Sequence, residues 1–196
     1  SRGLGDVYKR QGFTLLEPLV PVADAYLDGV REVGVTVDEA VFREHMVTTW
    51  EKLFEVRTGE HDLDSSDEIE RDGWFRFTRT VAEPFPELLA CHPEWLDILY
   101  RHFDSAEAWR PIDGVVSMLD RVKGLATLGI VSNWHSSLGP ILEGLGLADR
   151  FDFILTSAAV GKKKPHPEIF RQALARSGSA PERTLHIGDS VRDDIE

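Results

Sequence analysis

Between about residue 125 and residue 187, short apolar runs alternate with helical patterns, and this alternation constrains the fold more than any other feature. Residues 125–132, 151–156 and 184–187 are predicted strands, and residues 137–146 and 167–177 are predicted helices between them. Strands that are apolar along their whole length are typical of parallel sheets covered by helices on both faces. We therefore predict an α/β fold with a Rossmann-like, doubly wound parallel sheet.

Polar side chains follow each of these predicted strands. They are Ser132 and Asn133 after the first, Lys164 after the second, and Asp189 with Asp194 after the third. Each alone has an ordinary explanation, such as a helix cap for Ser132 or a solvated loop position for Lys164. In a doubly wound sheet, however, ligands bind beyond the carboxyl ends of the strands. Carboxylates suit Mg2+, and an ammonium with a hydroxyl suits a phosphoryl group, so the residues together predict a phosphate and metal site.

The chain from about residue 20 to residue 103 has the periodicity of helices instead. The predicted apolar stripes are Phe42, Met46, Trp50, Leu53 and Phe54; Ile69, Gly73, Phe77 and Val81; and Trp95, Leu96, Leu99, Tyr100 and Phe103. Thr36 and Glu39 have the spacing of a capping box at the start of the first of these helices. We interpret the stripes as the contact faces of a small helical bundle, in preference to an aromatic cofactor site.

The composition restricts the partners of the protein. A net charge of -12 over 196 residues argues against binding to nucleic acid or to an anionic membrane surface. The only dense basic run is 162–164, so an anionic ligand is expected to be held locally. The single cysteine, Cys91, excludes an internal disulfide and fits a reducing compartment. No apolar run approaches the roughly 20 residues that span a bilayer, and we expect a cytoplasmic protein.

Three segments resemble the motifs of a known family, the haloacid dehalogenase-like (HAD) hydrolases. IVSNW at 130–134 resembles the second motif of the family, with Ser132 as its phosphate-binding hydroxyl. GKKKPHPEIF at 161–170 resembles the third motif, with Lys164 as its lysine. HIGDSVRDD at 186–194 resembles the fourth motif, with Asp189 and Asp194 as its acidic pair. The resemblance implies an α/β core formed by residues 1–17 and 108–196 and an inserted helical cap formed by residues 18–107.

The first motif of this family is a strand that ends Asp-x-Asp-Gly-Thr-Leu, in which the first Asp is the nucleophile. Here Thr14 and Leu15 match its Thr-Leu, which puts Arg10 at the nucleophile position and Gly12 at the second Asp. A guanidinium is not a nucleophile at any accessible pH. The resemblance therefore implies that the nucleophile of the family is missing from this sequence.

The resemblance implies a Mg2+-dependent phosphatase that acts on a small phosphorylated metabolite through an aspartyl-phosphate intermediate. Catalytic roles fall on Ser132, Lys164 and Asp189, phosphate binding on Ser132, Asn133 and Lys164, and metal binding on Asp189 and Asp194. A 2-haloacid dehalogenase is the first alternative, although relatives of that type usually lack the acidic residue that corresponds to Asp189. Catalytically inactive alternatives are a response-regulator receiver, which has neither the helical insertion nor the acidic pair, and a HAD-fold binding protein.

Residues 6–11, DVYKRQ, are recognised as the translation of a transposon end sequence that is attached to DNA during the preparation of sequencing libraries. We therefore expect that residues 1–11 replace the natural first strand and its Asp, and that the chain is a fragment at both ends. On this interpretation, the polypeptide as written is inactive and poorly stable, whereas its natural parent is a hydrolase. Loss of the strand would also leave its neighbours without partners for their backbone hydrogen bonds.

Overall fold

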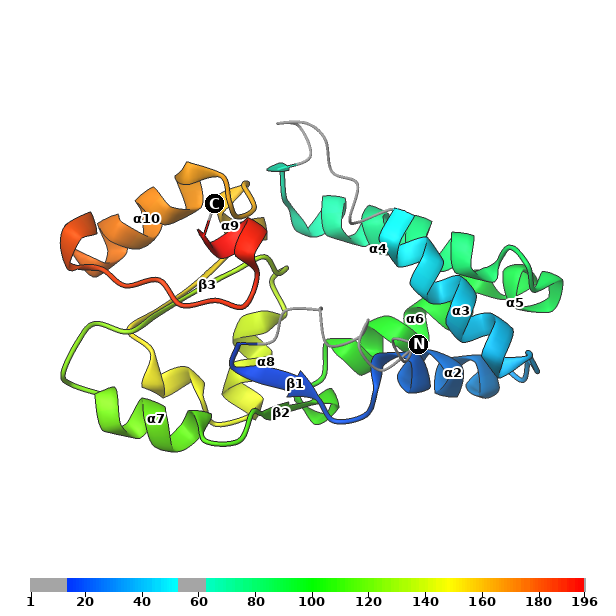
Figure 1. The fold of residues 1–196 in the computed structure, drawn as a ribbon. Helices are drawn as coiled ribbons and strands as arrows, with labels where there is room; N and C mark the ends of the chain where they lie inside the picture. Colours follow the sequence, from blue (N-terminus) through cyan, green and yellow to red (C-terminus); the bar gives the residue numbers. More distant parts are fainter. Residues whose placement is uncertain (1–13, 53–62, 196) are drawn as a thin grey trace.

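A computed structural model of the chain describes residues 14–52 and 63–195. It shows a helical lobe, from α2 (Val22–Glu32) to α6 (His92–Phe103), and an α/β lobe that holds β3 (Gly129–Ser132) and the helices around it (Figure 1). The predicted first-motif positions Arg10 and Gly12 lie outside the described residues, as do Leu53 and Phe54 of the first predicted stripe. Within the described part of the chain, no helix combines the length and the apolarity needed to cross a membrane.

The helical lobe consists of α2 (Val22–Glu32), α3 (Glu39–Trp50), α4 (Asp67–Ala82), α5 (Pro86–Ala90) and α6 (His92–Phe103). Its core contains the predicted stripe residues Phe42, Met46, Phe77, Val81, Trp95 and Leu99, all of which are buried. Ile69 was also predicted to lie on a buried stripe, but 42% of its surface is exposed. The first turn of α4, which contains Ile69, lies at the end of that helix nearest the α/β lobe (Figure 1).

The start of α3 corrects the predicted capping box. The N-cap is Asp38, whose Oδ1 accepts hydrogen bonds from the backbone N–H groups of Ala40 and Val41 at 3.0 and 3.1 Å. Thr36 lies two residues before this cap and is part of the preceding loop. A carboxylate at the N-cap satisfies two free N–H groups and also suits the positive end of the helix dipole.

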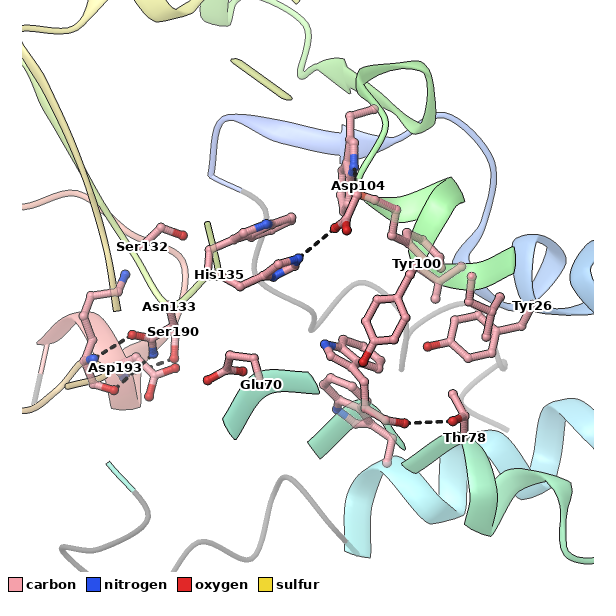
Figure 2. Close-up of a pocket in the computed structure, with 18 of the residues that line it drawn as sticks. Tyr26, Glu70, Thr78, Tyr100, Asp104, Ser132, Asn133, His135, Ser190 and Asp193 are labelled. Atoms are coloured by element: carbon pink, nitrogen blue, oxygen red, sulfur yellow. Dashed lines mark hydrogen bonds and ion pairs between the residues drawn. The ribbon is translucent and has the colours of Figure 1, made fainter. Parts of the chain in front are cut away.

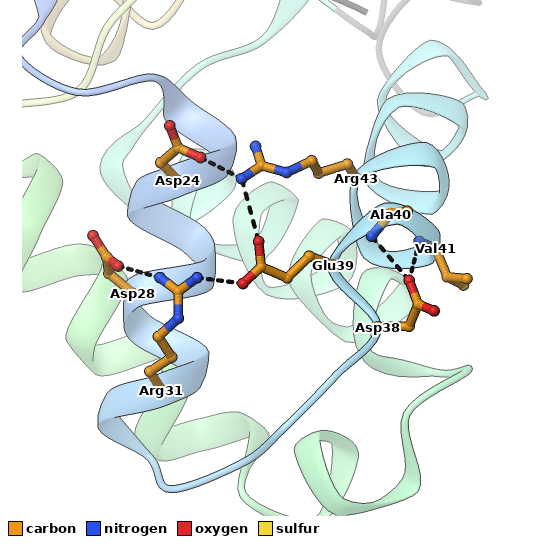
Figure 3. Close-up of polar contacts among 8 residues, drawn as sticks. All are labelled: Asp24, Asp28, Arg31, Asp38, Glu39, Ala40, Val41 and Arg43. Carbon is orange, nitrogen blue, oxygen red and sulfur yellow. Dashed lines mark hydrogen bonds and ion pairs between the residues drawn. The ribbon is translucent and has the colours of Figure 1, made fainter.

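Charged side chains connect α2 with the beginning of α3 (Figure 3). The Arg31 guanidinium donates to the carboxylates of Asp28 and Glu39, and the Arg43 guanidinium donates to the carboxylate of Asp24. Arg31 and its two partners are each more than half exposed. Surface pairs of this kind contribute little to stability, so the buried apolar faces hold the two helices together.

The α/β lobe contains α7 (Val115–Val122), β3 (Gly129–Ser132), α8 (Leu138–Gly144), β4 (Phe153–Thr156), α9 (Ser157–Val160) and α10 (Pro167–Ser177). Strands β3 and β4 are parallel, with Gly129 opposite Phe153 and Ser132 opposite Thr156. Helix α10 has the predicted bounds, and α8 lies inside the predicted helix 137–146. A second core surrounds Ile130, Ile141 and Leu142. The α/β class is therefore confirmed.

Two of the predicted strands are shorter than expected and the third is absent from the described structure. The chain turns near Gly124 (φ 79°) and Leu125 is 81% exposed, so β3 begins only at Gly129. Residues 184–187 form no strand, and Leu185 and Ile187 are 82% and 70% exposed. A strand needs a neighbour for its N–H and C=O groups, and no described strand lies beside these residues.

Two short strands join the lobes where the predicted cap departs from the core and returns to it. Strand β1 (Leu16–Pro18) pairs antiparallel with β2 (Trp109–Pro111), and Leu16 lies opposite Pro111. The Leu19 N–H also donates to the Ala108 carbonyl at 2.7 Å. The boundaries 17/18 and 107/108 thus lie side by side, and the division into core and cap remains a prediction from the family resemblance.

Candidate active site

A cleft of about 410 Å3 lies between the two lobes. The α/β lobe contributes polar side chains to it, namely Ser132, Asn133, Lys164, Asp189, Ser190, Asp193 and Asp194. The structure therefore brings all five predicted site residues to one cleft. Figure 2 shows Ser132, Asn133 and Asp193 on this side, with Glu70 lying between them and the tyrosines of the helical lobe.

Asn133 positions the backbone of the lysine loop. It follows β3 directly, and its side-chain Oδ1 accepts from the backbone N–H of Lys164 at 2.6 Å. Its Nδ2 donates to the Lys164 carbonyl oxygen at 3.1 Å. Both ends of the amide are used in this way, so Asn133 links the second and third motif segments. The phosphate-binding role of Asn133 stays a prediction, and the observed contacts show that its side chain positions the Lys164 backbone.

Lys164 and Asp194 form a nearly buried ion pair on the polar side of the cleft. Lys164 Nζ is 2.6 Å from Asp194 Oδ1, and the two side chains are 12% and 4% exposed. His186 Nε2 lies 2.9 Å from the same oxygen, and the Ser190 N–H donates to Asp194 Oδ2 at 3.0 Å. Burial raises the pKa of Asp194, but the hydrogen bonds from Lys164, His186 and Ser190 outweigh it and leave this pKa below its ordinary value.

Asp189 has a more open environment than Asp194. Its Oδ1 accepts a hydrogen bond from the Thr14 hydroxyl at 2.6 Å, and the residue is exposed at the cleft. Within residues 14–52 and 63–195, no group of three or more His, Cys, Asp or Glu side chains is arranged to hold a metal ion. Mg2+ commonly takes one or two carboxylates and completes its shell with water and phosphate oxygens. Asp189 and Asp193 at the cleft fit that donor set, whereas both oxygens of Asp194 already accept hydrogen bonds.

The helical lobe supplies the opposite wall, which sequence reasoning missed. One face of α4 brings Glu70, Trp74 and Thr78 to the cleft, and one face of α6 brings Tyr100 and Phe103. On α4 the spacing of four residues places these side chains on one face, beside the buried stripe. The signal was therefore present in the periodicity, but aromatic residues at helical spacing were assigned to packing alone.

Polar contacts across the cleft hold the lobes together. His135 Nε2 lies 2.8 Å from Asp104 Oδ1, and Lys163 Nζ lies 2.7 Å from Glu70 Oε1. Lys162 pairs with Asp64. Burial raises the pKa of Asp104, but the hydrogen bond and charge of His135, together with Ser137 and Arg71, outweigh this effect and leave the pKa below its ordinary value. Two of the three lysines in the basic run thus bind the helical lobe, and Lys164 alone belongs to the polar site.

Comparisons with known proteins identify the family of this chain. A family model described as haloacid dehalogenase-like hydrolase matches residues 21–196. Haloacid dehalogenase-like hydrolase domain-containing protein 3 of Mus musculus is 33% identical over 193 residues, which cover 93% of this chain and 73% of that protein. The chain therefore belongs to the haloacid dehalogenase-like hydrolases.

One further relative and one solved structure are also similar to this chain. The pyrimidine 5'-nucleotidase YjjG of Escherichia coli is 40% identical over 92 residues, which cover 46% of this chain and 41% of that enzyme. The crystal structure of YfnB from Bacillus subtilis, which is bound to magnesium, has a TM-score of 0.56 at 22% identity and covers 88% of this chain and 74% of YfnB. At that identity, the second likeness concerns the fold alone.

Proposed function

We propose that this chain derives from a Mg2+-dependent phosphatase that hydrolyses a small phosphorylated metabolite. The observation that carries the proposal is the convergence of Ser132, Lys164 and Asp189 at one end of an interlobe cleft. A hydroxyl and an ammonium placed together stabilise the negative charge of a phosphoryl group during transfer. The nucleotidase activity named for YjjG supports the same assignment.

Each residue has a separate task in this proposal. The Ser132 hydroxyl donates to a phosphoryl oxygen, and the Lys164 ammonium neutralises phosphoryl charge while Asp194 fixes its position. Asp189, with Asp193 beside the cleft, would hold Mg2+, and the ion would supply Lewis-acid polarisation of the phosphoryl group. The nucleophile of the family is an Asp that would form an aspartyl-phosphate, and position 10 carries Arg10 in its place. A phosphatase is favoured over a dehalogenase because Asp189 lies at the cleft.

The test first restores the missing Asp nucleophile and then removes the positive charge of Lys164. Residues 1–11 are replaced by an apolar strand that ends Asp-Ala, and the hydrolysis of a panel of metabolite phosphates is measured with and without Mg2+. We expect metal-dependent turnover that the unaltered chain lacks. In the restored protein, Lys164→Ala should lower turnover by about a hundredfold or more, because a charged donor to the phosphoryl group is lost.

Lys123→Ala is the matched control, since Lys123 donates to the Asp149 carbonyl oxygen on the surface. Turnover in this variant should stay within about twofold of the restored parent. If Lys164→Ala behaves like Lys123→Ala, Lys164 is only a loop residue and the proposed phosphate site is wrong. If the unaltered chain already hydrolyses phosphoesters, Arg10 does not occupy the nucleophile position.

A further inference from the structure

The wall opposite the polar side of the cleft is formed mainly by apolar side chains, most of them aromatic. Those from the helical lobe are Val22, Tyr26, Trp50, Trp74, Leu96, Leu99, Tyr100 and Phe103. Tyr26 and the two leucines are buried, whereas Trp50, Trp74, Tyr100 and Phe103 keep part of their surface exposed. The packing of the bundle therefore leaves part of each of these four rings uncovered.

The rings are held in place by their surroundings. Trp50 and Trp74 lie with their centroids 5.9 Å apart, and Trp74 also packs edge to face on Phe77 at 5.7 Å. The Tyr100 hydroxyl donates to the Arg71 carbonyl oxygen at 3.0 Å, and the Arg71 guanidinium lies 4.9 Å from the centre of the Tyr100 ring. A wall that is fixed in this way is preorganised for a ligand with a matching flat surface.

The charge of the wall is compatible with a ligand that carries a phosphoryl group. Burial is the main cause that raises the pKa of Tyr100 to about 12, so its phenol stays neutral at physiological pH. The one carboxylate of α4 at the cleft, that of Glu70, is paired with the Lys163 ammonium at 2.7 Å. Asp104, which follows α6, is the other carboxylate on this side, and it contacts His135 Nε2 at 2.8 Å. An anionic ligand thus meets neutral rings and two partnered carboxylates.

We propose that this wall is a subsite for the organic part of the substrate and that it selects a phosphomonoester with a planar aromatic ring. The inference rests on the proposed function for the phosphoryl end of the ligand. A cleft of about 410 Å3 has room for a ring beyond the phosphoryl group. A two-carbon phosphate would leave the rings of Trp74 and Tyr100 in contact with water. Stacking of a planar ring on an aromatic side chain strengthens binding by roughly five- to a hundredfold.

The test measures binding by titration calorimetry on the full chain in the presence of Mg2+, so it requires no turnover. Two matched pairs of ligands are compared. Phenyl phosphate is compared with ethyl phosphate, and uridine 5'-monophosphate with ribose 5-phosphate. We expect the ringed member to bind about tenfold more tightly in at least one pair. The pair with the larger difference tells whether the ring is attached directly to the phosphate or through a sugar.

Variants on α4 assign the effect to the wall. Trp74→Leu should reduce the difference within the responsive pair to less than about threefold. Phe75→Leu is the matched control, because Phe75 is a neighbouring aromatic residue that is 40% exposed and does not line the cleft. Phe75→Leu should retain the full difference. Tyr100→Leu is a second test on a different helix if Trp74→Leu lowers the melting temperature too far to be used.

Equal affinities within both pairs, or no binding of either ringed compound, would overturn the proposal. It is also overturned if both wall variants keep the parental difference. Failure of the proposed function has a different signature. Lys164→Ala should weaken all four ligands by a similar factor if the phosphoryl site is correct. If Lys164→Ala changes nothing while the ring effect persists, the phosphate site is wrong and the ring subsite stands.

Discussion

At the scale of single residues, the Asp194 carboxylate is tightly packed, and its surroundings leave no volume for an additional methyl group at Gly188. Its carboxylate contacts the Lys164 ammonium and the Ser190 N–H, and an added Cβ on Gly188 would lie 2.1 Å from Asp194 Cγ. Gly188→Ala should therefore displace Asp194 and destabilise the chain by about 1–3 kcal/mol in urea unfolding, the usual cost of overpacking. Gly139→Ala is the control, because a Cβ at Gly139 meets nothing within 4 Å. Equal stability of the two variants would show that the Asp194 carboxylate can move away at no cost.

At the scale of one element, two substitutions before α3 distinguish the observed N-cap, Asp38, from the predicted one, Thr36. Asp38→Ala removes an acceptor for the N–H groups of Ala40 and Val41, and it should cost about 1 kcal/mol in the free energy of unfolding. Thr36→Ala should change that free energy by less than about 0.5 kcal/mol, because a surface substitution away from a cap has little effect. Denaturant unfolding of the two variants measures the difference. If Thr36→Ala lowers the free energy of unfolding more than Asp38→Ala does, Thr36 is the N-cap and the predicted capping box is correct.

At the scale of the whole molecule, the pair formed by Asp104 and His135 makes the contact between the lobes sensitive to acid. The pKa of Asp104 is lowered in the folded state, so its carboxylate contributes stability above the ordinary value of 3.8. That contribution is lost as the pH falls through the lower folded pKa. Asp104→Asn should therefore flatten the fall in melting temperature between about pH 5 and pH 3 relative to the parent.

Asp97→Asn is the matched control for this prediction, because Asp97 is an exposed carboxylate on α6, the helix that ends just before Asp104. The control should keep the acid dependence of the parent. If Asp104→Asn and Asp97→Asn have the same pH profile, the pair with His135 does not contribute measurably to the folded state.

Local patterns in the sequence determined the α/β class, the helical segment from residue 20 to residue 103, and the five residues that meet at the cleft. Helix α10 occupies the predicted residues 167–177 because its apolar period, its proline at the start and the glycine after its end are all local signals. The positions of Ser132 and Lys164 after successive apolar runs were sufficient to predict their convergence, since strand ends in such a sheet share one edge. Asp189 lines the same cleft although residues 184–187 before it form no strand.

Only the tertiary structure decided which groups those side chains contact. The residues 184–187 have the composition of a strand, yet a strand exists only where a neighbour accepts and donates its hydrogen bonds. The lysines of the run 162–164 are alike in sequence, but they bind Asp64, Glu70 and Asp194 from three different segments. The partial exposure of the Trp74 and Tyr100 rings was not predicted either, because periodicity gives the face of a helix but not the element that covers it. Contacts between distant segments depend on how the lobes meet, and that is a property of the folded chain.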